Sequence, residues 1–100
     1  MTSINFGSVI IDTLEPQSNI MQLIMNDIKE KSGGDAIYAK SIICFEIQTD
    51  DEIQLKINDK HIVNVKNGVF CSPQGNVLYK IYSLINIDPI NSQTIIYYQW

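Results

Sequence analysis

The chain contains no arginine: its seven basic residues are all lysines, and with eleven acidic residues the formal net charge is −4. Arginine makes many of the bidentate contacts by which proteins hold phosphate groups and guanine bases, and a phosphate backbone repels a net negative chain. We therefore expect no nucleic acid among the partners. Acidic residues cluster only at Asp50, Asp51 and Glu52, which leaves a small acidic inhibitor that mimics DNA as an alternative function.

Groups for catalysis and metal binding are also scarce, because the chain has one histidine, His61, and two cysteines, Cys44 and Cys71. A nucleophilic cysteine needs a positioned base and oxyanion donors, and a zinc site needs three or four ligands. The sequence places no such groups together, it has no glycine-rich phosphate loop, and its acidic cluster lacks the alternating ligands of a calcium loop. We expect a protein that is not an enzyme and has no catalytic residue, cofactor or metal.

Long apolar runs are missing as well. None approaches the ~20 residues that a membrane-spanning helix needs, and the first residues lack the basic start and continuous apolar core of a signal peptide. Two cysteines make at most one disulfide. The expectation is a protein with no membrane partner that is assembled inside a cell with reduced thiols.

Isoleucine is abundant, at 19 positions, and favours strands over helices. Apolar residues alternate over 43–47 and 53–57, on either side of the acidic cluster, and we predict that residues 42–58 form an antiparallel hairpin with one buried face. The core is predicted from side chains that share one parity in three strands: Ile43, Phe45, Ile47, Ile53, Leu55, Ile57 and Ile81.

Helical spacing occurs in one segment, residues 18–32, where an apolar stripe is followed by Lys29, Lys31 and two glycines that stop the helix. This divides the chain into three parts. Residues 1–16 form an N-terminal arm, which is an edge strand or docks on a neighbour; residues 17–34 contain the amphipathic helix and its glycine stop; residues 35–100 form a β-sandwich domain.

Further strands are predicted over 61–66 and 69–71, joined by a tight turn at Asn67-Gly68, and over 77–87 and 94–100. The last segment is apolar on both sides, which is typical of a central strand. Together these patterns predict a mainly β fold, an antiparallel β-sandwich or flattened barrel of six or seven strands with one N-terminal helix.

Three segments carry a resemblance to a known group of proteins. These are Asp51-Glu52-Ile53-Gln54-Leu55-Lys56-Ile57-Asn58, Lys80-Ile81-Tyr82-Ser83-Leu84-Ile85-Asn86-Ile87 and Ile95-Ile96-Tyr97-Tyr98-Gln99-Trp100. They resemble the small β-sandwich structural proteins of tailed bacteriophage particles: capsid decoration or auxiliary proteins, head fibres, and collar or tail modules. The resemblance implies a virion protein that is assembled in the host cytoplasm, and under it the acidic alternative is a host-directed inhibitor. No functional residue carries over from it.

The expected function is therefore that of a non-enzymatic structural protein of the particle, acting through contacts with other virion proteins and with copies of itself. The residues expected to make these contacts lie in the arm and on the methionine stripe of the helix: Ile4, Phe6, Val9, Ile10, Ile11, Met21 and Met25. A surface glycan-binding module is the second alternative, because aromatic rings in a row can stack on sugars: Tyr79, Tyr82, Tyr97, Tyr98 and Trp100.

Overall fold

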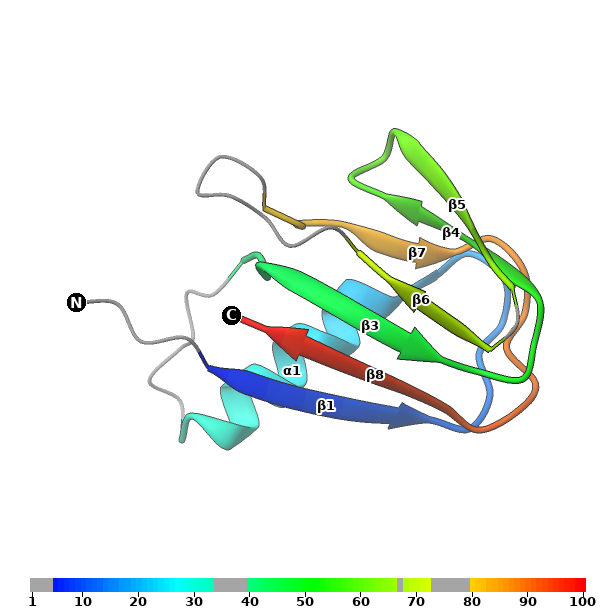
Figure 1. Cartoon of the computed structure of the whole chain (residues 1–100). Helices are drawn as coiled ribbons and strands as arrows, with labels where there is room; N and C mark the ends of the chain where they lie inside the picture. The colour runs from blue at the N-terminus through cyan, green and yellow to red at the C-terminus, as the bar shows by residue number, and fades with distance from the viewer. Residues whose placement is uncertain (1–4, 34–39, 67, 73–79) are drawn as a thin grey trace.

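In the part of the chain that the computed structural model describes, eight strands form two antiparallel four-stranded sheets, and one helix completes the second layer (Figure 1). The structure describes residues 5–33, 40–66, 68–72 and 80–100. The prediction of a mainly β sandwich with one helix is confirmed. The strand beyond the predicted seven is β2 (Ser18–Asn19), which is only two residues long.

The first sheet has the last strand of the chain near its centre. Its order is β1 (Phe6–Ile11), β8 (Thr94–Gln99), β3 (Cys44–Gln48), β6 (Val69–Cys71). Ile96 of β8 is paired with Val9 on one side and Ile47 on the other, and is fully buried. The prediction that residues 94–100 supply a paired central strand is confirmed.

The second sheet has the order β2, β7 (Leu84–Asn86), β4 (Ile53–Ile57), β5 (His61–Val65). A tight turn joins β4 to β5, with the Lys60 N–H donating to the Ile57 carbonyl over 3.2 Å. Asn58 and Asp59 have φ of 54° and 60° in this turn, as both central residues of a type I′ turn require, and Asn and Asp tolerate that conformation better than most residues.

The predicted hairpin over residues 42–58 is wrong, because β3 lies in the first sheet and β4 in the second. The apolar faces of the two strands are both buried in the core between the layers. A strand with one apolar face can bury that face whether the next strand pairs with it in the same sheet or lies across the core in the other sheet. Alternation alone therefore does not distinguish a hairpin from a connection that crosses between the two sheets. The crossing is fixed at residues 49–51, where Thr49 accepts a hydrogen bond from Thr94.

A second crossing joins β5 to β6, again where a hairpin was predicted. The two strands belong to different sheets. Gly68 has a φ of 90°, a conformation that favours glycine, and its carbonyl accepts a hydrogen bond from the Thr49 N–H over 2.9 Å. The two crossings therefore lie side by side. Asn67 of the predicted turn is outside the described residues.

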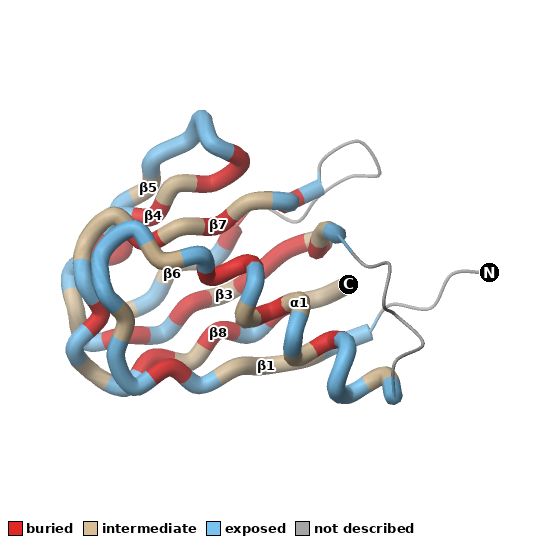
Figure 2. The backbone as a smooth tube through the Cα atoms, turned by 180° about the vertical axis from the view of Figure 1, so that it is seen from behind, coloured by how far each residue is buried: buried red, intermediate tan, exposed pale blue. Residues whose placement is uncertain are grey.

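The helix α1 (Ile20–Lys31) confirms the predicted helical segment, and Asn19 caps its start by accepting a hydrogen bond from the Gln22 N–H. Gly33 follows its end with a φ of 68°. The helix contacts β1 and β7 and lies beside the second sheet, covering the half of the first sheet formed by β1 and β8 (Figure 2). Four side chains of α1 are buried: Ile20, Met21, Ile24 and Ile28.

Six of the seven predicted core residues are buried, and Ile43 is the exception. The chain changes parity at the start of β3, where Ile42 is buried instead and forms an isolated bridge with Ile81. Within the predicted strand over 77–87, residues 77–79 lie outside the described part. The rest is interrupted before β7, because the Asn58 side chain accepts hydrogen bonds from the backbone N–H groups of Tyr82 and Ser83.

The segment between β1 and α1 is attached to the sandwich by Asn86, which is fully buried in β7. Its side-chain oxygen accepts from the Ser18 N–H over 3.1 Å, and its amide nitrogen donates to the carbonyls of Glu15 and Asp88 over 2.8 and 2.9 Å. Residues 6–19 are thus joined to both sheets. Of the two roles expected for the arm, residues 6–11 have that of an edge strand.

We predict that Asn86→Ala lowers the free energy of unfolding by about 2–4 kcal/mol, because it leaves a backbone donor and two carbonyls without their buried partner. Chemical denaturation of purified protein measures this loss. The matched control is Asn64→Ala on β5, an exposed asparagine that accepts a hydrogen bond from Gln54, for which a change within about 0.5 kcal/mol is expected. Equal effects of the two substitutions would contradict the role assigned to Asn86.

Candidate functional site

The residues expected to make assembly contacts separate into an exposed and a buried group. Phe6 and Ile10 are 73% and 63% exposed and lie on the outer face of β1. Val9 packs against the core from the opposite face of the strand. The others are divided as follows: Ile11 and Met21 are buried, Met25 is partly buried, and Ile4 lies outside the described residues. The structure therefore brings only Phe6 and Ile10 together on the surface.

The outer face of the first sheet contains more apolar side chains than Phe6 and Ile10. Antiparallel pairing places Ile10 beside Ile95, and Ile95 beside Gln48, which is paired with Val69. The next row pairs Ser8 with Tyr97 and Tyr97 with Glu46. Val69 and Tyr97 are both exposed. We call this surface the outer face; it comprises Phe6, Ser8, Ile10, Glu46, Gln48, Val69, Ile95, Tyr97 and Gln99.

A shallow hollow of about 410 Å³ lies on the outer face, between aromatic and polar side chains. Its lining includes Phe6, Tyr97, Glu46, Gln48 and Gln99. An aromatic ring beside amide and carboxylate groups offers both a stacking surface and hydrogen-bond partners. Tyr97 was predicted only as one of the sugar-stacking rings, and Ile95 was not among the predicted contact residues, although their shared parity in the last strand places both on one face.

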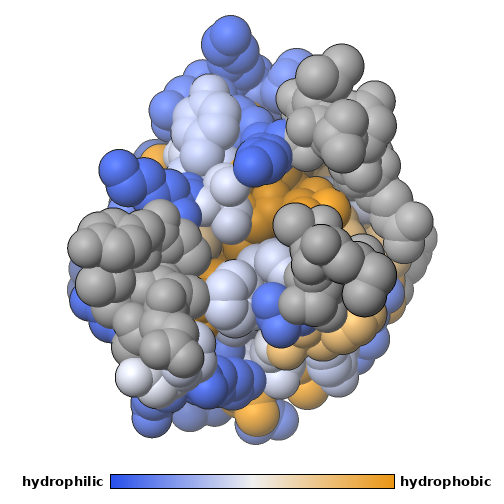
Figure 3. All heavy atoms as spheres, turned by 90° about the vertical axis from the view of Figure 1, so that its left-hand side faces the viewer, coloured by the Kyte–Doolittle hydropathy of each residue, from blue (hydrophilic) through white to orange (hydrophobic). Residues whose placement is uncertain are grey.

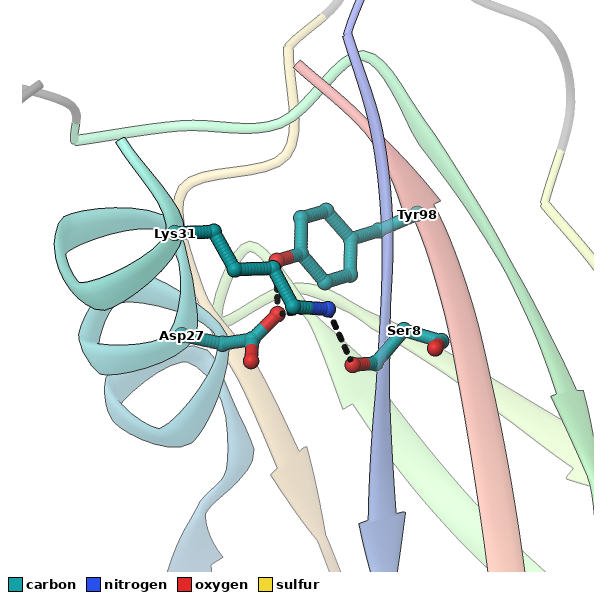
Figure 4. A network of polar contacts seen from close by, with 4 residues as sticks. All are labelled: Ser8, Asp27, Lys31 and Tyr98. Carbon is teal, nitrogen blue, oxygen red and sulfur yellow. Dashed lines mark hydrogen bonds and ion pairs between the residues drawn. The ribbon is translucent and has the colours of Figure 1, made fainter. Parts of the chain in front are cut away.

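Polar contacts join α1 to β1 and β8 at the edge of the first sheet (Figure 4). The Tyr98 hydroxyl donates a hydrogen bond to the Asp27 carboxylate. Asp27 also forms an ion pair with Lys31 over 3.0 Å, and the Lys31 ammonium donates to the Ser8 carbonyl over 3.1 Å. Burial, together with the neighbouring Asp27 carboxylate, raises the pKa of Tyr98 well above its usual range, so the phenol stays protonated and remains a donor.

Gly7 makes this arrangement possible. It is paired with Tyr98 across the two strands, and a Cβ atom at Gly7 would come within 2.4 Å of the Tyr98 ring. The Tyr98 ring therefore lies over the backbone of β1 at Gly7, and its hydroxyl reaches Asp27 of α1. This contact connects the two layers at an edge where the second sheet does not extend.

Histidine and the two cysteines are not brought together. His61 lies in β5 of the second sheet, whereas Cys44 and Cys71 lie in β3 and β6 of the first. Burial raises the pKa of Cys44. The Glu46 carboxylate accepts a hydrogen bond from the Cys71 thiol and raises its pKa, which keeps the sulfur in its less nucleophilic form. Among the described residues no group of three or more metal-ligating side chains is found.

The aromatic residues considered for glycan stacking do not form one row. Tyr97 is exposed on the first sheet, whereas Tyr82 is exposed beside a separate hollow of about 430 Å³ that is also lined by Met21, Met25 and Lys29 of the helix. Tyr98 is buried and Trp100 is partly buried against the core. Tyr79 lies outside the described residues. Of these five aromatic residues, the described part of the chain places only Tyr97 exposed on the outer face.

Asp51, the middle residue of the acidic cluster, is hydrogen-bonded to the loop before β8. The Asp51 carboxylate accepts hydrogen bonds from the Asn91 and Ser92 N–H groups over 2.7 and 3.0 Å. The Asn91 N–H holds the pKa of Asp51 below its usual range, although partial burial acts in the opposite direction. Asp51 therefore joins the crossing between β3 and β4 to the loop before β8.

The end of the molecule at which the C-terminus lies has a mixed surface, with hydrophilic residues beside a central apolar patch (Figure 3). Within the described residues no helix is long and apolar enough to cross a membrane.

Comparisons with protein-family models, with curated proteins and with solved structures give no match.

We predict that Gly7→Ala lowers the free energy of unfolding by about 1–3 kcal/mol, because the added methyl group displaces the Tyr98 ring. Thermal or chemical denaturation measures the loss. Two controls isolate the cause. Ser8→Ala on the same strand should change stability by less than about 0.5 kcal/mol, and Gly7→Ala should cost little in a Tyr98→Leu background, whose shorter side chain leaves room for the methyl group. An undiminished cost in that background would contradict the proposed clash.

We predict that Asp51→Asn destabilises the protein at neutral pH and that the difference from the wild type shrinks in acid. A carboxylate whose pKa is lower in the folded than in the unfolded chain stabilises the fold above its unfolded pKa and loses this contribution as the pH falls through the folded pKa. Denaturation at pH 7 and near pH 3 measures the two differences. Asp50→Asn, at the exposed neighbouring position, is the matched control at pH 7. A gap that stays constant down to pH 3 would contradict the assignment.

Proposed function

We propose that the chain is a non-enzymatic structural protein of a bacteriophage particle, a capsid decoration, head-fibre, collar or tail component, that acts through protein–protein contacts. The placement in a phage particle is supported by the resemblance of residues 51–58, 80–87 and 95–100 to small β-sandwich proteins of such particles. The contact role is supported by one observation, the exposure of four large apolar side chains on the outer face: Phe6, Ile10, Val69 and Tyr97.

These side chains have the chemistry of a protein-binding surface. Aromatic residues are enriched in interfaces because they bury much area with few rotatable bonds. Polar side chains lie among these apolar ones on the outer face: Ser8 and Glu46 are paired with Tyr97, and Gln48 is paired with Ile95. A partner that covers the outer face would remove the apolar area from water and still find hydrogen-bond donors and acceptors.

A second candidate function is supported by the hollow beside Tyr97. Its ring stands among Glu46, Gln48 and Gln99, and a sugar could stack on the ring while its hydroxyl groups bond to these side chains. In this version the same face contacts a surface glycan of the host instead of a virion protein.

The particle role is tested with phage whose genome encodes the chain. We expect the protein in purified particles at a fixed molar ratio to the major capsid protein, measured by quantitative mass spectrometry. Tyr97→Glu should reduce that ratio at least about tenfold, since it places a charge in the centre of a desolvated contact. Tyr82→Glu is the matched control, because Tyr82 is an exposed tyrosine like Tyr97, at 53% against 42%, but lies away from the outer face.

Two results would contradict the proposal: absence of the protein from purified particles, or equal incorporation of the two tyrosine variants. Glycan binding is distinguished by a glycan array probed with the isolated protein. Binding that is lost in Tyr97→Glu and kept in Tyr82→Glu, with normal incorporation of both, would favour the second candidate.

A further inference from the structure

The outer edge of β1 is an unpaired row of backbone groups. Asn5 and Trp100 exchange two hydrogen bonds, over 2.9 and 3.0 Å, and bonded pairs alternate along an antiparallel ladder. The N–H and C=O groups of Gly7, Val9 and Ile11 therefore face β8, and those of Phe6, Ser8 and Ile10 point away from the sheet. Among the described residues these outward groups have one partner, the Lys31 ammonium on the Ser8 carbonyl.

The other three sheet edges have the usual protection against pairing with another chain. β2 and β6 are two and three residues long, and β5 begins with His61 and is flanked by Lys60 and Lys66. Short strands and charged residues are the common means by which proteins block edge pairing. β1 has neither, because it is six residues long and its sequence FGSVII contains no charge.

We propose that two copies of the chain pair through β1, antiparallel to each other, about a two-fold axis at Ser8. In this register Ser8 lies opposite Ser8 of the partner subunit, and Phe6 lies opposite Ile10 of the partner subunit. The outward N–H and C=O groups of Phe6, Ser8 and Ile10 then pair with those of the partner subunit, because this register places outward-facing residues opposite outward-facing residues. The two first sheets become one continuous eight-stranded sheet.

The side chains support the same register. Phe6 and Ile10 are the most exposed large apolar residues of the described chain, at 73% and 63%. The two-fold axis makes each the direct cross-strand neighbour of the other, and an aromatic residue opposite a β-branched one is a favourable pair. Since β1 is uncharged, no like charges approach each other when the strand pairs with itself.

Lys31 has to leave the Ser8 carbonyl when the copies pair. Its ammonium keeps the Asp27 carboxylate as a partner, and the side chain is 51% exposed, so it loses one hydrogen bond and returns to water. This inference goes beyond the particle role, because pairing through β1 is a property of the isolated chain and requires no virion component.

The first test is the mass in solution, by light scattering and sedimentation across a range of concentrations. We expect the 11.4 kDa chain to form a dimer at high concentration. Ile10→Lys should raise the dimer dissociation constant about tenfold or more, because each copy loses an apolar cross-strand pair. Ile62→Lys is the matched control, since Ile62 is an exposed isoleucine of similar accessibility on β5. A wild type that stays monomeric at every concentration, or equal effects of the two variants, would overturn the proposal.

The second test is a cysteine placed on the two-fold axis. Directly opposed residues of a hydrogen-bonded antiparallel pair have Cα atoms about 5.5 Å apart, within the range that a disulfide spans. In a Cys71→Ser background, Ser8→Cys should form a covalent dimer on mild oxidation, while Ile10→Cys, which is opposite Phe6 of the partner subunit, should not. Absence of the Ser8→Cys dimer, or equal cross-linking at both positions, would overturn the register. A monomeric wild type whose Lys31→Met variant dimerises would show instead that Lys31 protects the edge.

Discussion

The fold depends on the burial of apolar side chains between the first sheet and a second layer made partly of a sheet and partly of a helix. Ile96 of β8, Leu55 of β4 and Ile24 of α1 are all fully buried in this one core. A chain of this length buries a smaller share of its surface than a larger domain, so each such side chain contributes a large part of the stability. Around this core, the side chains of Asn58 and Asn86 hold neighbouring loops in place by hydrogen bonds to their backbone groups.

Element types were predictable because they depend on local periodicity. The helix over 20–31 and the central strand over 94–99 follow from spacing and from two-sided apolarity, and the buried parity of β4 follows from alternation. Strand partners were not predictable in the same way. The crossings after β3 and β5 look like hairpin turns in sequence, and they are decided by contacts with distant residues, such as Thr49 with Thr94.

The candidate site was predictable in part for the same reason. Phe6 and Ile10 share the exposed parity of β1, but Val9 and Ile11, close by on the same strand, face inward. When a short strand has apolar residues on both faces, its sequence does not show which face will be buried; this depends on where the neighbouring layer packs. The position of α1 under β1 decides it, and one contact that joins the two, the Tyr98 ring that passes over Gly7 to reach Asp27, is revealed by no local pattern.

The position of β8 between β1 and β3 also sets an order of events during synthesis. β1 leaves the ribosome early, yet its partner in the sheet is β8, which is made long after it and after β3. Until β8 is available, the strands on either side of it have no central partner, and their ladder groups stay open to water or to other chains. Pairings between distant segments form slowly, and unpaired strands are exposed to aggregation during that delay. The first sheet can therefore close only after β8 has been synthesised, because that one strand completes two ladders.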